Sequence, residues 1–74
     1  MATATDLMVT DYARDLLERL REAKAKAVRT DDAFDAGRKL GLYEALSMLV
    51  NRTGSFNIPA ELLGLNGIDP DEFL

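Results

Sequence analysis

The side chains able to do chemistry in this 74-residue chain are carboxylates, lysines, tyrosines and hydroxyls, because the sequence contains no His and no Cys. General acid and base catalysis near neutral pH usually uses His, and a thiolate nucleophile requires Cys. Glu44 is the only acid inside the long apolar run, and it lacks the partner His of di-iron and di-manganese bundles. We therefore expect Glu44 to lie at a solvated rim and the protein to be non-enzymatic.

Two short stretches resemble phosphate or metal sites but lack essential parts. The stretch "GRKLG" at 37–41 falls inside a predicted helix, without the Gly-Lys-Ser/Thr ending and the preceding strand of a phosphate-binding loop. Asp69, Asp71 and Glu72 offer carboxylates, but a twelve-residue calcium loop would need ligands well beyond position 74. We expect no cofactor and no metal.

A basic segment at 19–29 contains a single acid, Glu22. Its candidate nucleic-acid patch consists of Arg19, Arg21, Lys24, Lys26 and Arg29. No aromatic residue interleaves these cations, and the whole chain has a net charge of −4, so the pattern favours a solvated helix face over a nucleic-acid contact. A nucleic-acid-associated regulator using this segment is the alternative function.

Apolar residues at helical spacing predict two long helices. After a flexible start at 1–6, the first helix covers 7–29 and has one buried side. The second helix covers 32–53 and ends where Gly54 offers a left-handed stop. Because the connection is only a few residues long, the helices are expected to return antiparallel as a hairpin.

Residues 54–74 follow as a loop, a short helix and a tail. The short helix is predicted to begin at Pro59 and to end at Gly64. We see no repeat and no linker, so 1–74 is expected to form one all-α domain.

Small residues recur every four positions on the second helix, at Ala33, Gly37, Gly41 and Ala45. Each interior Gly costs about 1 kcal/mol relative to Ala, so close packing has to offset that loss. We predict that this row is the groove in which the first helix packs, within the hairpin.

A second apolar surface lies on the far side of the same helix. It consists of Leu42, Leu46, Leu49 and Val50, and we predict that a two-fold related copy covers it as the oligomer interface, giving a dimeric four-helix bundle. A chain of this size hides only about 60% of the surface that its unfolded form exposes, which favours assembly. The alternative cover is the chain's own C-terminal part, through Phe56, Ile58, Leu62, Leu63 and Leu65.

The C-terminal third mixes acids with large apolar residues, a composition typical of segments that dock into a partner's groove. The candidate partner-binding tail consists of Phe56, Ile58, Leu62, Leu63, Phe73 and Leu74. The competing interpretation is that Leu62, Leu63 and Leu65 close the open end of the hairpin.

No stretch reaches the roughly 18 uninterrupted apolar residues of a membrane span, and the N-terminal residues lack the pattern of a targeting peptide. The sequence therefore predicts a cytoplasmic protein without membrane contact. Its expected function is that of a small helical interaction or adaptor protein acting as a homodimer.

Overall fold

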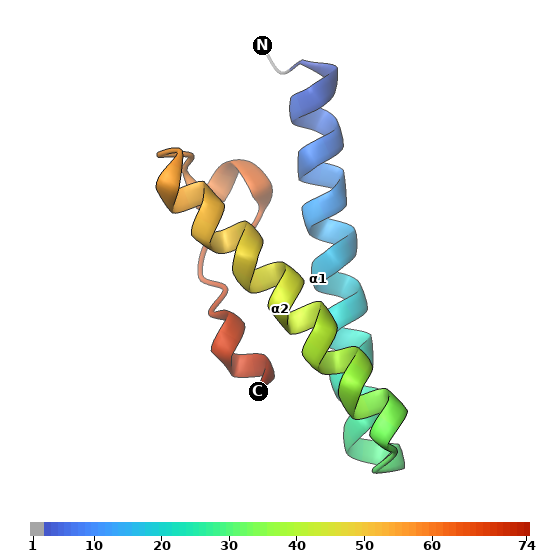
Figure 1. Cartoon of the computed structure of the whole chain (residues 1–74). Helices are drawn as coiled ribbons and strands as arrows, with labels where there is room; N and C mark the ends of the chain where they lie inside the picture. Colours follow the sequence, from blue (N-terminus) through green and yellow to red (C-terminus); the bar gives the residue numbers. More distant parts are fainter. Residues whose placement is uncertain (1–2) are drawn as a thin grey trace.

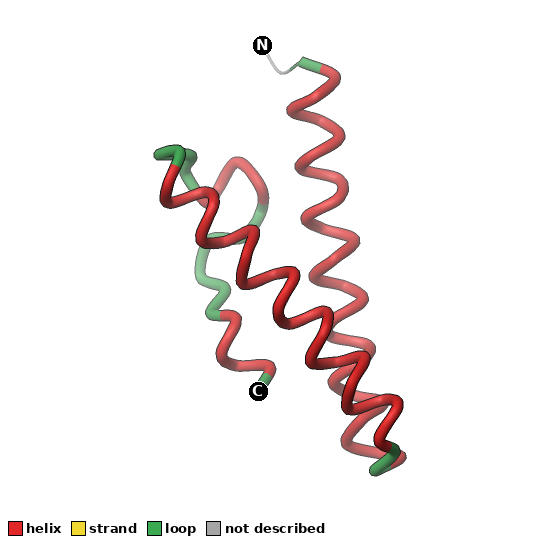
Figure 2. Tube along the Cα trace, viewed as in Figure 1, coloured by secondary structure: helices red, strands yellow, loops and turns green. Residues whose placement is uncertain are grey.

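The computed structural model describes residues 3–74, and within them it contains helices and turns but no strand (Figures 1 and 2). The elements are α1 at Ala4–Thr30, α2 at Ala33–Ser55, and two short 3₁₀ helices, η1 at Ala60–Leu63 and η2 at Pro70–Phe73. The predicted all-α helical hairpin is confirmed. The predicted four-helix bundle would need two chains, and the structure contains one, so this part stays a prediction.

A capping box starts α1 earlier than the sequence suggested. The backbone amide of Asp6 donates to the Thr3 hydroxyl at 3.1 Å, and the Thr3 amide donates to the Asp6 carboxylate at 3.0 Å. Two of the free amides at the helix start are satisfied in this way. The helix therefore begins at Ala4, within the predicted flexible start at 1–6, whose first two residues lie outside the described part.

The turn between α1 and α2 is two residues long. Asp31 adopts a left-handed backbone with φ of 50° and donates its amide to Ala27 at 3.2 Å, which ends α1. Asp32 then caps α2 by accepting the Phe34 amide at 2.9 Å. So short a connection forces the helices to turn back on each other.

A buried acid holds the two helices together beside this turn. Asp35 of α2 is only 5% exposed and accepts a hydrogen bond from the Thr30 hydroxyl at 2.7 Å. The Lys26 ammonium lies 3.8 Å from its other oxygen. A buried carboxylate requires such partners because desolvation of an unpaired charge is costly.

The end of α2 differs from the prediction. Gly54 is not left-handed; α2 continues to Ser55, and the positive φ of 55° occurs at Asn57. The next prediction, a short helix between Pro59 and Gly64, is confirmed as η1, with Pro59 before it and Gly64 at φ of 69° as its left-handed end.

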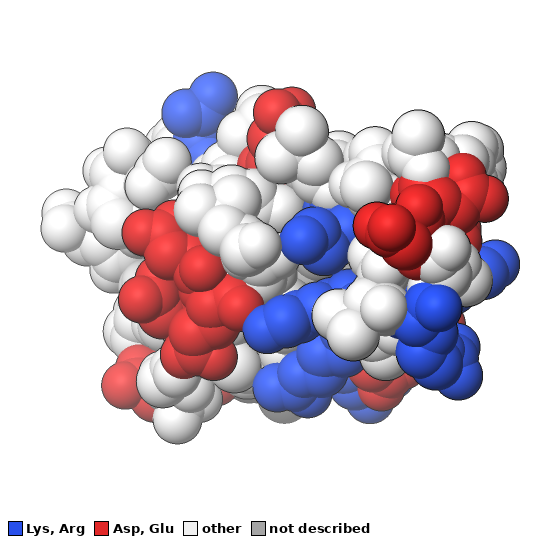
Figure 3. Space-filling model, turned by 90° about the horizontal axis from the view of Figure 1, so that it is seen from below, with Lys and Arg blue, Asp and Glu red and all other residues white. Residues whose placement is uncertain are grey.

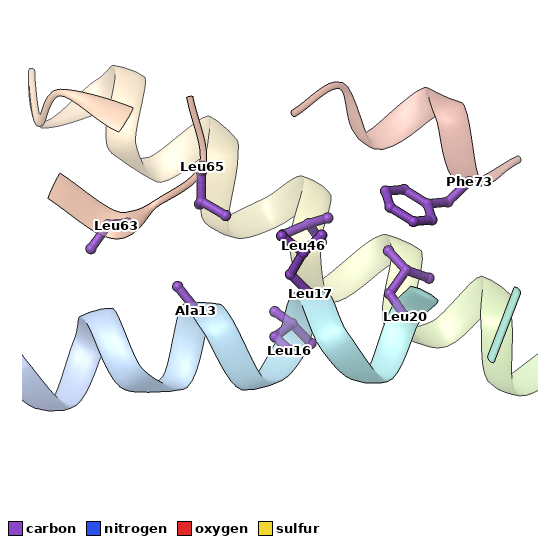
Figure 4. Close-up of a cluster of buried hydrophobic side chains, with 8 residues drawn as sticks. All are labelled: Ala13, Leu16, Leu17, Leu20, Leu46, Leu63, Leu65 and Phe73. Carbon is purple, nitrogen blue, oxygen red and sulfur yellow. The ribbon is translucent and has the colours of Figure 1, made fainter. Parts of the chain in front are cut away.

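The two long helices lie close at the turn and diverge toward the opposite end, and the C-terminal residues pack along this widening gap (Figure 1). Figure 4 shows leucines of α1 pointing at Leu46 of α2 and at side chains from the chain end. The buried cluster consists of Ala13, Leu16, Leu17, Leu20, Leu46, Leu63, Leu65 and Phe73.

This core corrects the prediction for the second apolar surface of α2. Leu46 is completely buried within the single chain, and Leu42, Leu49 and Val50 are partly buried against the same cluster. This surface is therefore the one that faces α1 and the C-terminal residues, and Leu46 has no surface left for a second copy.

Three of the four small residues on α2 face away from the core, which corrects the predicted close packing for Ala33, Gly37 and Gly41, whereas Ala45 packs against the core cluster. Ala33, Gly37 and Gly41 are exposed and Ala45 is partly buried. A Cβ atom added at Gly37 or Gly41 would meet no atom within 4 Å. The physical reason is that burying a leucine contributes about 1.5–3 kcal/mol, whereas a glycine row offers little apolar area.

Replacing these exposed glycines should stabilise the protein. We expect Gly37→Ala and Gly41→Ala each to raise the free energy of unfolding in urea by about 0.5–1 kcal/mol, because each removes the entropic cost of an interior helical glycine. Gly64→Ala is the control and should lower it, because residue 64 has a positive φ. A loss at Gly41 similar to that at Gly64 would contradict the exposure of the row.

Replacing Leu46 should damage folding rather than assembly. Leu46→Ala is expected to lower the free energy of unfolding by about 2–5 kcal/mol, as for other large-to-small core changes. Leu46→Asp should lose the helical circular dichroism signal at room temperature, because it buries an unpaired charge. A folded Leu46→Asp chain would contradict the described core.

Candidate functional site

An apolar groove with a volume of about 490 Å³ lies at the open end of the hairpin. We call it the open-end groove. Its walls come from α1, α2, the loop after α2, and η1, and its lining residues are Asp6, Leu7, Val9, Thr10, Leu49, Arg52, Thr53, Phe56, Ile58, Leu62 and Leu63. Its volume lies within the usual range of binding clefts.

The groove exists because η1 fills only part of the gap between the diverging helices. The Thr10 hydroxyl of α1 lies between two carbonyls, 2.9 Å from that of Asp6 and 3.1 Å from that of Leu62, so its one proton is shared between α1 and η1. In this position Leu63 is buried in the core, whereas the Leu62 side chain is 64% exposed. One residue thus completes the core and its neighbour enlarges the apolar surface.

Large apolar side chains remain exposed around the groove. Leu7 is 62% exposed, Phe56 71% and Ile58 43%. Single exposed apolar residues are common on protein surfaces, but a group of them around one hollow is typical of an interaction site.

Two opposite charges line the groove on different walls, Asp6 from α1 and Arg52 from α2. The backbone amide of Thr3, followed by its hydroxyl, holds the pKa of Asp6 below its ordinary value of 3.8. The carboxylate is therefore charged at neutral pH. Because the pKa is lowered in the folded chain, the stabilisation from this contact is present at neutral pH and is lost as the pH falls through that lowered pKa.

The candidate partner-binding tail divides into buried and exposed members. Leu63 and Phe73 are buried in the core, so the prediction that they bind a partner is corrected. Phe56, Ile58 and Leu62 line the open-end groove, and Leu74 is 67% exposed. The competing interpretation, that these leucines close the hairpin, holds for Leu63 and Leu65 but not for the exposed Leu62.

Lysines from both long helices contact the last three residues of the chain. The Lys24 ammonium of α1 lies 5.6 Å from the centre of the Phe73 ring and donates to the Glu72 carbonyl at 2.6 Å. Lys39 of α2 donates to the Leu74 carbonyl at 3.3 Å. A cation over an aromatic face is attracted by the ring electrons, so the acid-rich chain end packs on basic helix surfaces.

Three members of the candidate nucleic-acid patch make contacts within the chain. Arg19 pairs with Asp15, Lys24 contacts the C-terminal residues, and Lys26 faces Asp35. Arg21 and Arg29 line a second groove that contains Lys24, Val28, Ile68 and Phe73 among others. Figure 3 shows basic side chains gathered on the underside with acidic groups on both sides.

The described residues form neither a metal site nor a membrane span. No group of three His, Cys, Asp or Glu residues able to hold a metal occurs at 3–74, and Glu44 is exposed on α2. No helix in this range is both long enough and apolar enough to pass through a bilayer.

Protein-family models, curated proteins and solved structures gave no significant match to the chain. The polar groups that line the open-end groove are one acid, one base and two threonines, within an otherwise apolar lining.

Six lining residues were not among the predicted site residues, namely Asp6, Leu7, Val9, Thr10, Arg52 and Thr53. The hairpin register gave a usable signal, because a turn near residue 30 places the start of the first helix opposite the end of the second. Helical periodicity alone could not find them, since it reports which side of one helix is apolar but not where two helices separate.

Tyr43 connects α2 to η2 by a hydrogen bond. Its hydroxyl donates to the Asp71 carboxylate at 2.9 Å. This hydrogen bond is the main reason that the pKa of Tyr43 is raised above its ordinary value of 10.0, and burial adds to it. The raised pKa means that the stabilisation is complete below pH 10.0 and is lost as the pH rises through the Tyr43 pKa.

Removing the carboxylate should lower this pKa. In a Tyr12→Phe background, which leaves Tyr43 as the single tyrosine, we expect Asp71→Asn to shift the ultraviolet titration of Tyr43 toward lower pH. Asp69→Asn is the control and should shift the titration less, because Asp69 raises the Tyr43 pKa through its charge alone and not through a hydrogen bond. An unchanged titration in Asp71→Asn would contradict the docking of η2 on α2.

Proposed function

We propose that this chain is a small non-enzymatic interaction protein that acts as a homodimer, and that the open-end groove is its contact surface. The observation that carries the proposal is the cluster of exposed apolar side chains around the groove, notably Leu7, Phe56 and Leu62. Contiguous apolar surface of this kind marks protein-interaction sites in soluble proteins.

The size of the chain supports assembly. A 74-residue chain hides only about 60% of its unfolded surface, and disulfides are excluded by the absence of Cys. Pairing through the groove would remove Leu7, Phe56 and Leu62 from water without changing the described core. It would also place the contact at the open end, instead of on the buried surface of α2 that includes Leu46.

A binding role is also favoured over catalysis by the chemistry of the groove. The lining is apolar apart from Asp6, Thr10, Arg52 and Thr53. The hydroxyls of Thr10 and Thr53 already donate to backbone carbonyls, and the Asp6 carboxylate accepts the Thr3 amide. These groups hold the helices and η1 in place, and none lies beside a His or Cys partner.

Sedimentation equilibrium tests the proposal. At about 100 µM, where a dimer of micromolar dissociation constant is mostly assembled, we expect a mass near twice that of the 8.2 kDa chain. Leu62→Asp should shift the equilibrium to the single chain, because it places a charge in the apolar contact. Leu40→Asp is the matched control and should assemble like the unchanged protein, since Leu40 is 48% exposed on α2 outside the groove.

A single 8.2 kDa species at every concentration would contradict the homodimer. Equal effects of Leu62→Asp and Leu40→Asp would contradict the assignment of the contact to the groove. Far-ultraviolet circular dichroism on both variants separates loss of assembly from loss of folding.

A further inference from the structure

The open-end groove has two charged lining residues, and they come from different helices. Asp6 belongs to the first turns of α1, and Arg52 belongs to the last turn of α2. Among residues 3–74, neither forms an ion pair with another side chain. The Asp6 carboxylate accepts the Thr3 amide at 3.0 Å, and no cationic side chain of the described residues is paired with it.

We propose that two copies of the chain pair about a two-fold axis running along the open-end groove, so that Asp6 of each copy faces Arg52 of the other. This inference rests on the proposed homodimer and specifies how its two copies are oriented. A two-fold interface is self-complementary, because a contact from residue i to residue j is repeated from j to i.

The placement of the charges selects this axis over the other simple choice. Rotation about an axis along the groove exchanges its walls, which brings the acid of one copy over the base of the other at two places. Rotation about an axis across the groove keeps each wall on its own side, which places Asp6 against Asp6 and Arg52 against Arg52. Like charges facing each other disfavour the second arrangement.

The apolar lining and the charges have separate roles in this pairing. Exposed Leu7, Phe56 and Leu62 supply the apolar area that is removed from water. An exposed ion pair changes a dissociation constant by only about two- to fivefold, so the reciprocal pairs mainly set orientation. The attraction between opposite walls should weaken as salt concentration rises.

Charge exchange between variants gives the decisive experiment. Asp6→Arg leaves two cations on the rims of the groove, and Arg52→Asp leaves two anions, so each variant alone should dimerise at least fivefold more weakly. An equimolar mixture should recover dimers of near wild-type affinity, now composed of one copy of each variant, because both reciprocal pairs are again opposite in charge. Native mass spectrometry distinguishes the mixed dimer from the two others by mass.

Net charge does not produce this recovery. The chain carries −4, so Asp6→Arg gives −4 + 2 = −2 and Arg52→Asp gives −4 − 2 = −6, and both variants remain acidic. The control pair Asp15→Arg and Arg38→Asp has the same net charges but lies outside the groove. These controls should dimerise like the unchanged protein and show no preference for mixed dimers.

Loss of the helix cap is controlled separately, because Asp6 also closes the capping box of α1. Thr3→Ala removes the hydroxyl of that box and leaves the rim charge, so we expect its dimer to be retained. Asn51→Asp adds an acid to the last turns of α2 without lining the groove, and it should also dimerise normally. The double variant Asp6→Arg/Arg52→Asp restores both pairs in one chain and should recover dimerisation.

The outcomes separate this inference from the proposed function. A wild-type chain that stays monomeric removes the second copy as the occupant of the groove, leaving a different protein to fill it, and overturns the homodimer together with this pairing. A wild-type dimer with no recovery in the mixture and in the double variant overturns the pairing alone. Equal losses in Thr3→Ala and Asp6→Arg assign the effect to the helix cap and also overturn the pairing.

Discussion

The divergence of α1 and α2 from a two-residue turn is the constraint on which the rest of the structure depends (Figure 1). Near the turn the helices are close enough for Thr30 and Lys26 to contact the buried Asp35. Farther along, the two helices cannot cover each other's leucines, so a third element has to enter the gap. The C-terminal residues do this through η1 and η2, and buried Leu63 and Phe73 complete the core.

The same divergence accounts for the open-end groove. Because η1 is a four-residue element, it covers the core below it and leaves apolar side chains such as Leu62 facing outward. The features that stabilise the single chain and the surface proposed for pairing are therefore two consequences of one geometry. Thr10 links them, since its hydroxyl contacts the η1 backbone while the residue lines the groove.

Much of the local structure could be predicted from the sequence. Apolar spacing gave both long helices, and Pro59 with Gly64 gave η1, because these signals depend on neighbouring residues alone. The orientation of α2 could not be predicted, since one of its sides carries leucines and the other carries a row of small residues, and both are compatible with a helix contact. Phe73 is buried among core residues that are distant in the sequence, with Lys24 over its ring, and an acid-rich chain end gave no local indication of this. The open-end groove was missed for the same reason, because it arises only where two helices separate.

The claim that the chain closes its own core with its C-terminal residues can be tested most directly by nuclear Overhauser spectroscopy on the full chain at a concentration where it is monomeric. Figure 4 places the Phe73 ring beside Leu20 of α1. The structure predicts cross-peaks between the Phe73 ring protons and the Leu20 methyl protons within the single chain. A Phe73 ring with averaged chemical shifts and no long-range cross-peaks, in a chain whose two long helices are intact, would contradict the account.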